Sequence, residues 1–220
     1  MEGLVFQFQN VWLPDGEKHF PEWMAKNGEL VDGRGTYQIK KWRACLPWIK
    51  NWRTAVDVGG HVGLWAMHMA NKFNYVHAFE PVEAFRECFV ANVGIPSDKT
   101  SLYSNALGAR AGIVGMAVNP ADTGGTHVIP GESTVLRALD EFDFRDVDFI
   151  KIDTEGFELE VLRGAKDTLL RCEPCVIVEQ KPHKLGPNFG IKGTPAVDYL
   201  RAMGAELRQA ISGDYILSWP

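Results

Sequence analysis

The chain has 220 residues, of which 45% are hydrophobic, and this predicts one domain with a substantial core, with or without an N-terminal extension. The net charge of −5 and the pI of about 5.7 argue against a broad nucleic-acid surface. The absence of a long apolar run and of a signal-peptide pattern predicts no membrane span and a cytoplasmic location.

The first 35 residues are rich in glycine and proline, and short strands are expected near Val5–Phe8 and Val11–Leu13. From Tyr37 to Ile49, apolar residues recur every three or four positions and predict an amphipathic helix, bent or restarted at Pro47. Five tryptophans also lie in the first quarter of the chain. They favour core packing, with stacking on a ligand as the alternative.

A glycine-rich turn follows the first predicted core strand, Thr54–Val58. The turn contains Gly59, Gly60 and Gly63, and a helix is predicted from Val62 to Asn71. Glycines at such a turn admit a ligand where a β-carbon would block it, and a helix N-terminus presents its amides there. The alternative is a tight strand–helix turn that binds nothing.

The second predicted strand ends at Glu80, about 20 residues after the turn, which is the spacing of nucleoside sites in Rossmann-like sheets. The dinucleotide pattern G-x-G-x-x-G and the P-loop are both absent. Asp57, beside the turn, would repel a pyrophosphate but tolerate a ligand with a sulfonium and an amino group. S-adenosylmethionine fits that description.

Further strands and helices alternate to the end of the chain. Strands are predicted at Thr100–Ser104, Asp148–Asp153, Cys175–Glu179, Glu206–Ile211 and Tyr215–Trp219, and helices at Val82–Asn92, Thr134–Phe142, Glu158–Leu170 and Pro195–Met203. This order predicts an α/β fold with a mostly parallel sheet, helices on both faces and a C-terminal antiparallel hairpin. Its ligands should bind at the carboxyl ends of the strands.

The block Val147–Ala165, Val-Asp-Phe-Ile-Lys-Ile-Asp-Thr-Glu-Gly-Phe-Glu-Leu-Glu-Val-Leu-Arg-Gly-Ala, resembles the signature of FkbM-type methyltransferases. Asp57–Gly63 is similar to the D-x-G-A-N-x-G of that family, with Gly60 in place of Ala and His61 in place of Asn. The resemblance covers roughly residues 52–182. It implies a class I methyltransferase fold with a Rossmann-like, seven-stranded sheet, S-adenosylmethionine as cofactor and, usually, methylation of a hydroxyl oxygen.

The resemblance also implies roles for individual residues. The expected cofactor contacts are Asp57, Gly59, Gly60, His61 and Gly63 at the methionine end, Glu80 at the ribose, Asn105 and Ala106 at the adenine, and Asp153 near the methyl group. For Asp57 the alternatives are that it orients the turn or that it binds the cofactor's amino group. Independently of the resemblance, the segment Arg34–Gln38 before the predicted amphipathic helix is expected to fold over the cofactor, with an exposed loop as the alternative.

Acids at the tips of the fourth and fifth core strands suggest how the acceptor hydroxyl loses its proton. One hypothesis is a divalent cation such as Mg²⁺, held by Asp153, Glu179 and Gln180. The other is direct proton transfer to a catalytic residue, for which Asp153, Glu155, Glu179 and His183 are the candidates. The alternative for Glu155 is a purely structural role, in which it caps the next helix.

We expect residues 1–50 to form a cap that contributes to the acceptor site, and residues 51–220 to form the cofactor-binding domain. The expected acceptor is a small molecule or a glycan. The alternatives are a nucleic-acid methyltransferase and a cofactor-binding module without activity. The acidic Asp153-Thr-Glu-Gly156 argues against nucleic acid, because carboxylates repel phosphates.

Overall fold

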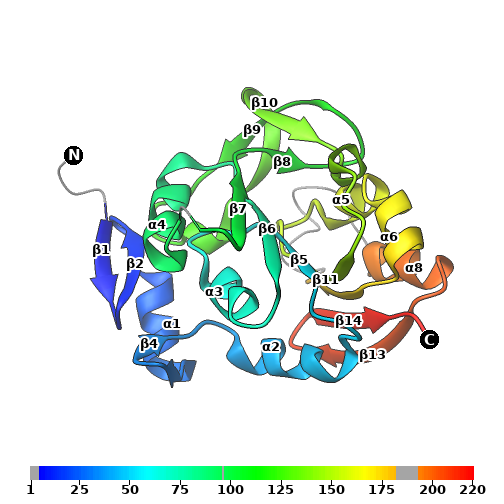
Figure 1. Ribbon diagram of the computed structural model, residues 1–220. Helices are drawn as coiled ribbons and strands as arrows, with labels where there is room; N and C mark the ends of the chain where they lie inside the picture. Colours follow the sequence, from blue (N-terminus) through cyan, green and yellow to red (C-terminus); the bar gives the residue numbers. More distant parts are fainter. Residues whose placement is uncertain (1–4, 96, 182–192) are drawn as a thin grey trace.

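The computed structural model describes residues 5–95, 97–181 and 193–220. A seven-stranded sheet lies at its centre, in the order β13-β14-β12-β11-β5-β6-β7 (Figure 1). Its strands are β5 (Thr54–Val58), β6 (Tyr75–Phe79), β7 (Thr100–Tyr103), β11 (Val147–Ile152), β12 (Cys175–Glu179), β13 (Glu206–Ile211) and β14 (Asp214–Ser218). β14 runs antiparallel to both β12 and β13, and the other neighbouring pairs of this sheet are parallel. The predicted mostly parallel sheet and C-terminal hairpin are therefore confirmed.

Helices cover both faces of this sheet because alternate residues of each strand point to opposite sides. The helices are α2 (Ile39–Cys45), α3 (Leu64–Ala70), α4 (Glu83–Val93), α5 (Glu158–Arg163), α6 (Lys166–Cys172) and α8 (Pro195–Ala202). Val56 and Val58 pack with α5, α6 and α8, whereas Ala55 and Phe149 pack with α2 and α3. Such strands, apolar on both sides, are typical of a parallel sheet between two helical layers.

The predicted helix Glu158–Leu170 is wrong as a single element, because α5 and α6 are separate and meet at Gly164–Ala165. A β-carbon on Gly164 would lie 2.0 Å from the Gly108 carbonyl oxygen. The chain therefore breaks where a neighbouring loop touches its backbone, a contact that helical periodicity cannot reveal.

The predicted helix Thr134–Phe142 is also wrong. Its first part belongs to β10 (His127–Arg137), which pairs antiparallel with β9 (Gly112–Ala117) and parallel with β8 (Ala106–Leu107). Only η3 (Leu139–Phe142) is helical, as a short 3-10 turn. Backbone pairing with a distant strand has overridden the local apolar spacing. The β9–β10 ribbon lies outside the central sheet (Figure 1).

The N-terminal segment packs against the helices beside the sheet. It contains β1 (Val5–Phe8), β2 (Val11–Pro14), α1 (His19–Asn27), β3 (Leu30–Val31) and β4 (Arg34–Gly35), and the short 3-10 turn η1 (Leu46–Trp48) follows α2. Leu13, Phe20 and Met24 share a buried cluster with Val62 and Leu64 of the next segment. No helix in the described ranges has the length and apolarity needed to cross a membrane.

Candidate active site

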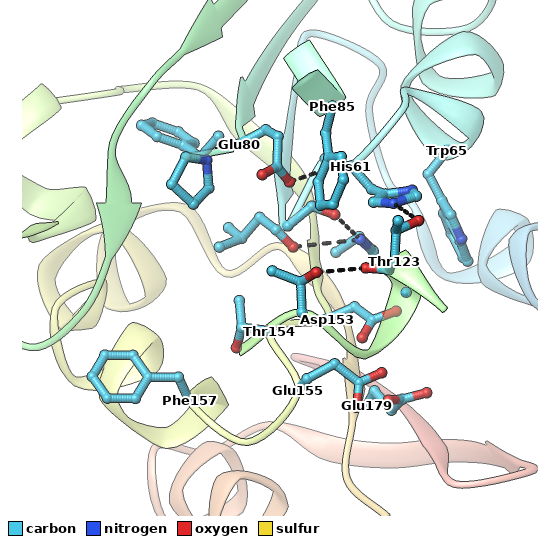
Figure 2. A pocket seen from close by; sticks show the side chains of 18 of the residues that line it. His61, Trp65, Glu80, Phe85, Thr123, Asp153, Thr154, Glu155, Phe157 and Glu179 are labelled. Atoms are coloured by element: carbon cyan, nitrogen blue, oxygen red, sulfur yellow. Dashed lines mark hydrogen bonds between the residues drawn. The ribbon is translucent and has the colours of Figure 1, made fainter. Parts of the chain in front are cut away.

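A pocket opens at the carboxyl ends of β5, β6, β11 and β12 (Figure 2). Of the predicted site residues, those that line it are Gly59, Gly60, His61, Glu80, Asn105, Ala106, Asp153, Glu155 and Glu179. Asp57, Gly63 and Gln180 are not among its lining residues. His183 lies outside the described residues.

The three glycines of the turn are required mainly by the protein's own packing. Gly59 has φ +75°, and a β-carbon there would lie 2.0 Å from the Asp153 carbonyl oxygen. β-Carbons on Gly60 and Gly63 would meet side chains of α4 at 3.1 and 2.8 Å. The amides of Gly59 and Gly60 both donate to the Phe79 carbonyl oxygen. These contacts hold the turn against β6, β11 and α4, so that its pocket side stays open.

Asp57 supports the turn from beneath. Its carboxylate is fully buried, and its Oδ1 atom lies 3.3 Å from the Nζ atom of Lys151. Lys151 also donates to the Gly59 carbonyl oxygen at 2.6 Å. Burial raises the pKa of Asp57, and the charge of Lys151 opposes that rise. The position favours the interpretation in which Asp57 orients the turn, because the carboxylate does not line the pocket.

Glu80 follows β6 directly and is 5% exposed. Its Oε2 atom accepts a hydrogen bond from the His61 amide at 2.9 Å, and Oε1 accepts one from the Val82 amide at 2.8 Å. These bonds hold the carboxylate at the pocket wall. Burial raises its pKa to about 7, although both amide bonds oppose the rise. Each oxygen keeps a second lone pair for a ligand hydroxyl.

His61 lies in the left-handed region, with φ 48°. Its ring stacks on Phe20 with a centroid distance of 4.8 Å and meets Phe85 edge-on at 4.5 Å. Its Nε2 atom lies 2.8 Å from the Oγ1 atom of Thr123. Burial lowers the pKa of His61 to about 3, so the imidazole is neutral.

Three carboxylates gather in the lower part of the view in Figure 2. One oxygen each of Asp153, Glu155 and Glu179 lies within 4.8 Å of the others. Lys181 forms an ion pair with Glu179. Burial raises the pKa of Glu179 to about 8, its two acidic neighbours add to the rise, and Lys181 opposes it. A carboxylate with such a pKa can take up a proton near neutral pH.

The predicted metal set is only partly brought together. Asp153 and Glu179 lie in the carboxylate cluster. Gln180 is 1% exposed, and its Oε1 atom accepts a hydrogen bond from the Ala196 amide at 2.8 Å, at the start of α8. Its carbonyl oxygen is therefore engaged by a helix N-terminus. The Lys181 ammonium supplies positive charge at Glu179, where the hypothesis placed a divalent cation.

Sequence reasoning missed several lining residues, namely His19, Phe20, Phe85, Thr123, Phe157 and Lys181. Lys181 could have been found, because it follows the tip of β12 by two residues. Thr123 sits in a segment without periodicity and gave no signal. The predicted segment Arg34–Gln38 does contribute Tyr37 to the pocket, whereas the Arg34 side chain donates to the Asn92 carbonyl oxygen.

The tryptophans are not among the lining residues, apart from Trp65. Trp42 is 5% exposed and packs on Trp65 and Phe149. Trp23 meets the edge of Tyr37 at 4.6 Å. Core packing is thus the role that Trp42 fulfils, and Trp23 contacts Tyr37, which lines the pocket.

The family model for the methyltransferase FkbM domain matches residues 57–210. No curated protein matches the chain significantly. Solved structures with the same fold include a methyltransferase FkbM from Methylobacillus flagellatus KT, at 17% identity and a TM-score of 0.52, covering 76% of this chain and 43% of that one. The chain thus spans less than half of that protein's length.

Two further structures align over most of both chains. The fibrillarin pre-rRNA processing protein of Methanococcus jannaschii has 12% identity and a TM-score of 0.51, covering 100% of this chain and 99% of its own. The precorrin-6y C5,15-methyltransferase of Geobacter metallireducens GS-15 has 14% identity and a TM-score of 0.51, covering 89% and 95%. At these identities the likeness shows the class I methyltransferase fold alone.

Proposed function

Since the chain belongs to the FkbM methyltransferase domain family, we propose that it transfers the methyl group of S-adenosylmethionine to a hydroxyl oxygen of a small molecule or glycan. One observation carries this proposal. A single pocket contains the glycine turn with Glu80 and, at the tips of the adjoining strands, the cluster of Asp153, Glu155 and Glu179. The proposal is supported because an acid suited to binding ribose hydroxyls and acids suited to accepting a proton line the same pocket.

The side chains that line the pocket suit the chemical groups of S-adenosylmethionine. Glu80 can accept hydrogen bonds from two ribose hydroxyls, because amides use only one lone pair on each of its oxygens. Asn105 and Ala106 line the pocket together with Leu107 and Phe157, which offer apolar surface to a purine. The carboxylates suit the positive sulfonium and ammonium groups of S-adenosylmethionine.

The cofactor, when bound, supplies an activated methyl group. The chain has to orient the acceptor, exclude water and accept the hydroxyl proton. We assign proton acceptance to Glu179, whose raised pKa of about 8 lets it bind a proton readily. Lys181 limits that rise and so keeps part of the Glu179 population ionised near neutral pH. Asp153 and Glu155 remain candidates for the same step.

The proposal requires no metal ion. The Mg²⁺ hypothesis has no support from the comparisons, and Gln180 is bonded to the α8 N-terminus. Residues 1–50 are proposed as an acceptor-side cap, which is supported by the positions of His19, Phe20 and Tyr37 in the pocket wall. A reducing cytoplasmic setting is proposed because all four cysteines are free thiols.

Calorimetric titration with S-adenosylhomocysteine tests the cofactor. We expect micromolar binding that is weakened at least about tenfold in Glu80→Ala, since two charge-assisted hydrogen bonds are lost. Glu87→Ala, which removes an exposed acid of α4, serves as the control. Absence of binding to the folded wild-type protein would refute the methyltransferase proposal.

A second experiment addresses turnover. The protein is incubated with S-adenosylmethionine and panels of hydroxylated small molecules, oligosaccharides and RNA, and methylated products are detected by mass spectrometry. Cofactor binding without product on any panel would favour the module without activity. Product on RNA alone would favour the nucleic-acid alternative.

A further inference from the structure

Three residues that are far apart in sequence form a chain of hydrogen bonds behind the methionine end of the proposed cofactor site. Glu17 precedes α1 and is 3% exposed, and Thr123 in η2 (Thr123–Gly125) is 2% exposed. The Oε2 atom of Glu17 accepts hydrogen bonds from both the amide and the hydroxyl of Thr123. The Thr123 oxygen in turn contacts Nε2 of His61 at 2.8 Å. In Figure 2 this last contact is drawn as a dashed line.

The direction of these bonds determines where the His61 proton lies. A carboxylate can only accept, so the single hydroxyl proton of Thr123 is directed to Glu17. The Thr123 oxygen must then accept from His61, which requires a proton on Nε2. Because the ring is neutral, its Nδ1 atom carries a lone pair.

The Nδ1 lone pair is available to a ligand. Within residues 5–95, 97–181 and 193–220, no hydrogen bond to this atom occurs. The ring lines the pocket, and Phe20 and Phe85 hold it from two sides. The backbone amide of the same residue binds Glu80, so His61 adjoins the proposed ribose site on its methionine side.

We propose that Glu17 and Thr123 are positioning residues that hold His61 as the Nε2–H tautomer, so that Nδ1 accepts a hydrogen bond from the ammonium group of the cofactor's amino-acid part. This inference rests on the proposed function. It assigns a specific role to the histidine that replaces the asparagine of the related motif. It also makes residues from the N-terminal segment part of the cofactor site.

Two ligands separate this role from general damage to the pocket. S-adenosylhomocysteine carries the amino-acid part, whereas 5′-methylthioadenosine keeps the nucleoside and sulfur but lacks that part. His61→Phe retains an aromatic ring between Phe20 and Phe85 and removes the acceptor. We expect it to weaken S-adenosylhomocysteine binding about tenfold or more, as for the loss of one charge-assisted hydrogen bond, with 5′-methylthioadenosine binding unchanged.

Thr123→Val should weaken S-adenosylhomocysteine binding less than His61→Phe does, in proportion to the fraction of His61 that it shifts to the Nδ1–H tautomer, with 5′-methylthioadenosine binding unchanged. Thr123→Ser, which keeps the hydroxyl, should retain wild-type affinity. In long-range ¹H–¹⁵N spectra, the His61 signals are assigned from the His61→Phe variant. They should show the Nε2–H tautomer in the wild-type and Thr123→Ser proteins, and a mixture of tautomers in Thr123→Val.

The outcomes distinguish this inference from the proposed function. If neither ligand binds the folded wild-type protein, the cofactor assignment fails and the inference fails with it. If S-adenosylhomocysteine binds the wild-type and His61→Phe proteins equally, or the wild-type tautomer is Nδ1–H, the inference alone is overturned. Equal losses for both ligands would also overturn it, because they indicate a deformed pocket.

Discussion

Lys151 of β11 pairs with Asp57 of β5 in the parallel register, and its ammonium lies 3.3 Å from the Asp57 carboxylate and 2.6 Å from the Gly59 carbonyl oxygen. One buried cation thus neutralises the acid before the glycine turn and holds the turn itself. The pair thus joins β5, which leads into the glycine turn, to β11, which leads into Asp153 and Glu155.

Replacing Lys151 with an uncharged residue should destabilise the fold, because Asp57 is buried. Lys151→Met leaves Asp57 buried without its counter-charge, and we expect the free energy of unfolding to fall by about 3–5 kcal/mol. Adding Asp57→Asn should recover part of that loss, because the charge is then gone. Urea unfolding measures both, with the exposed Lys72→Met as control. A loss no larger than that of the control would contradict the role given to the pair.

The turn glycines allow strain and close packing to be separated. Gly59→Ala combines φ +75° with a β-carbon 2.0 Å from a backbone oxygen, whereas Gly94→Ala has φ +82° and nothing within 4 Å. We expect Gly94→Ala to cost about 1–2 kcal/mol from strain alone, and Gly59→Ala to cost clearly more. The urea midpoints of the two variants measure the two losses of stability. Equal effects would show that the contact with the Asp153 carbonyl is unimportant.

Cofactor affinity should depend on pH through Glu80. Its pKa in the folded protein is raised to about 7, and the protonated carboxyl has lost an acceptor for the ribose. Binding of S-adenosylhomocysteine is therefore expected to be about tenfold weaker at pH 6 than at pH 8 if only the ionised form binds. Calorimetry in buffers of matched ionic strength provides the measurement. Glu80→Gln should bind weakly at both pH values, and a wild-type affinity independent of pH would refute the assignment.

Stability should depend on pH through Glu179. Because its pKa rises to about 8 in the folded protein, the folded state binds a proton more tightly than the unfolded chain does. That stabilisation is complete below the ordinary glutamate pKa and is lost as the pH rises through about 8.

Between pH 6 and pH 9 we expect Glu179 to lower the free energy of unfolding by roughly 3 kcal/mol. In Glu179→Gln the change in the free energy of unfolding between these pH values should be smaller by that amount. The exposed Glu87→Gln should behave as wild type. Parallel pH profiles of the wild-type and Glu179→Gln proteins would contradict the raised pKa.

Local pattern was sufficient for much of the fold. β5, β12 and β13 have their predicted bounds. β5 and β12 are short, mostly apolar runs, which favour strands whatever their partners, whereas the more polar β13 was predicted as an arm of the C-terminal hairpin. The glycine turn and Glu80 could be placed at one sheet edge from spacing alone, since parallel strands all end there. The sequence by itself therefore determined the sheet and the family resemblance, and most of the site residues predicted from it do line the pocket.

Only the tertiary structure decided the features that depend on contacts between distant segments. β10 replaced a predicted helix because β9 was available to pair with it, and α5 separates from α6 because Gly164 touches Gly108. The Gln180 side chain accepts a hydrogen bond from the Ala196 amide at the start of α8 and does not join the carboxylate cluster. The bonds from Glu17 through Thr123 to His61 span 106 and 62 positions, and no local periodicity records which side chains meet once the chain has folded.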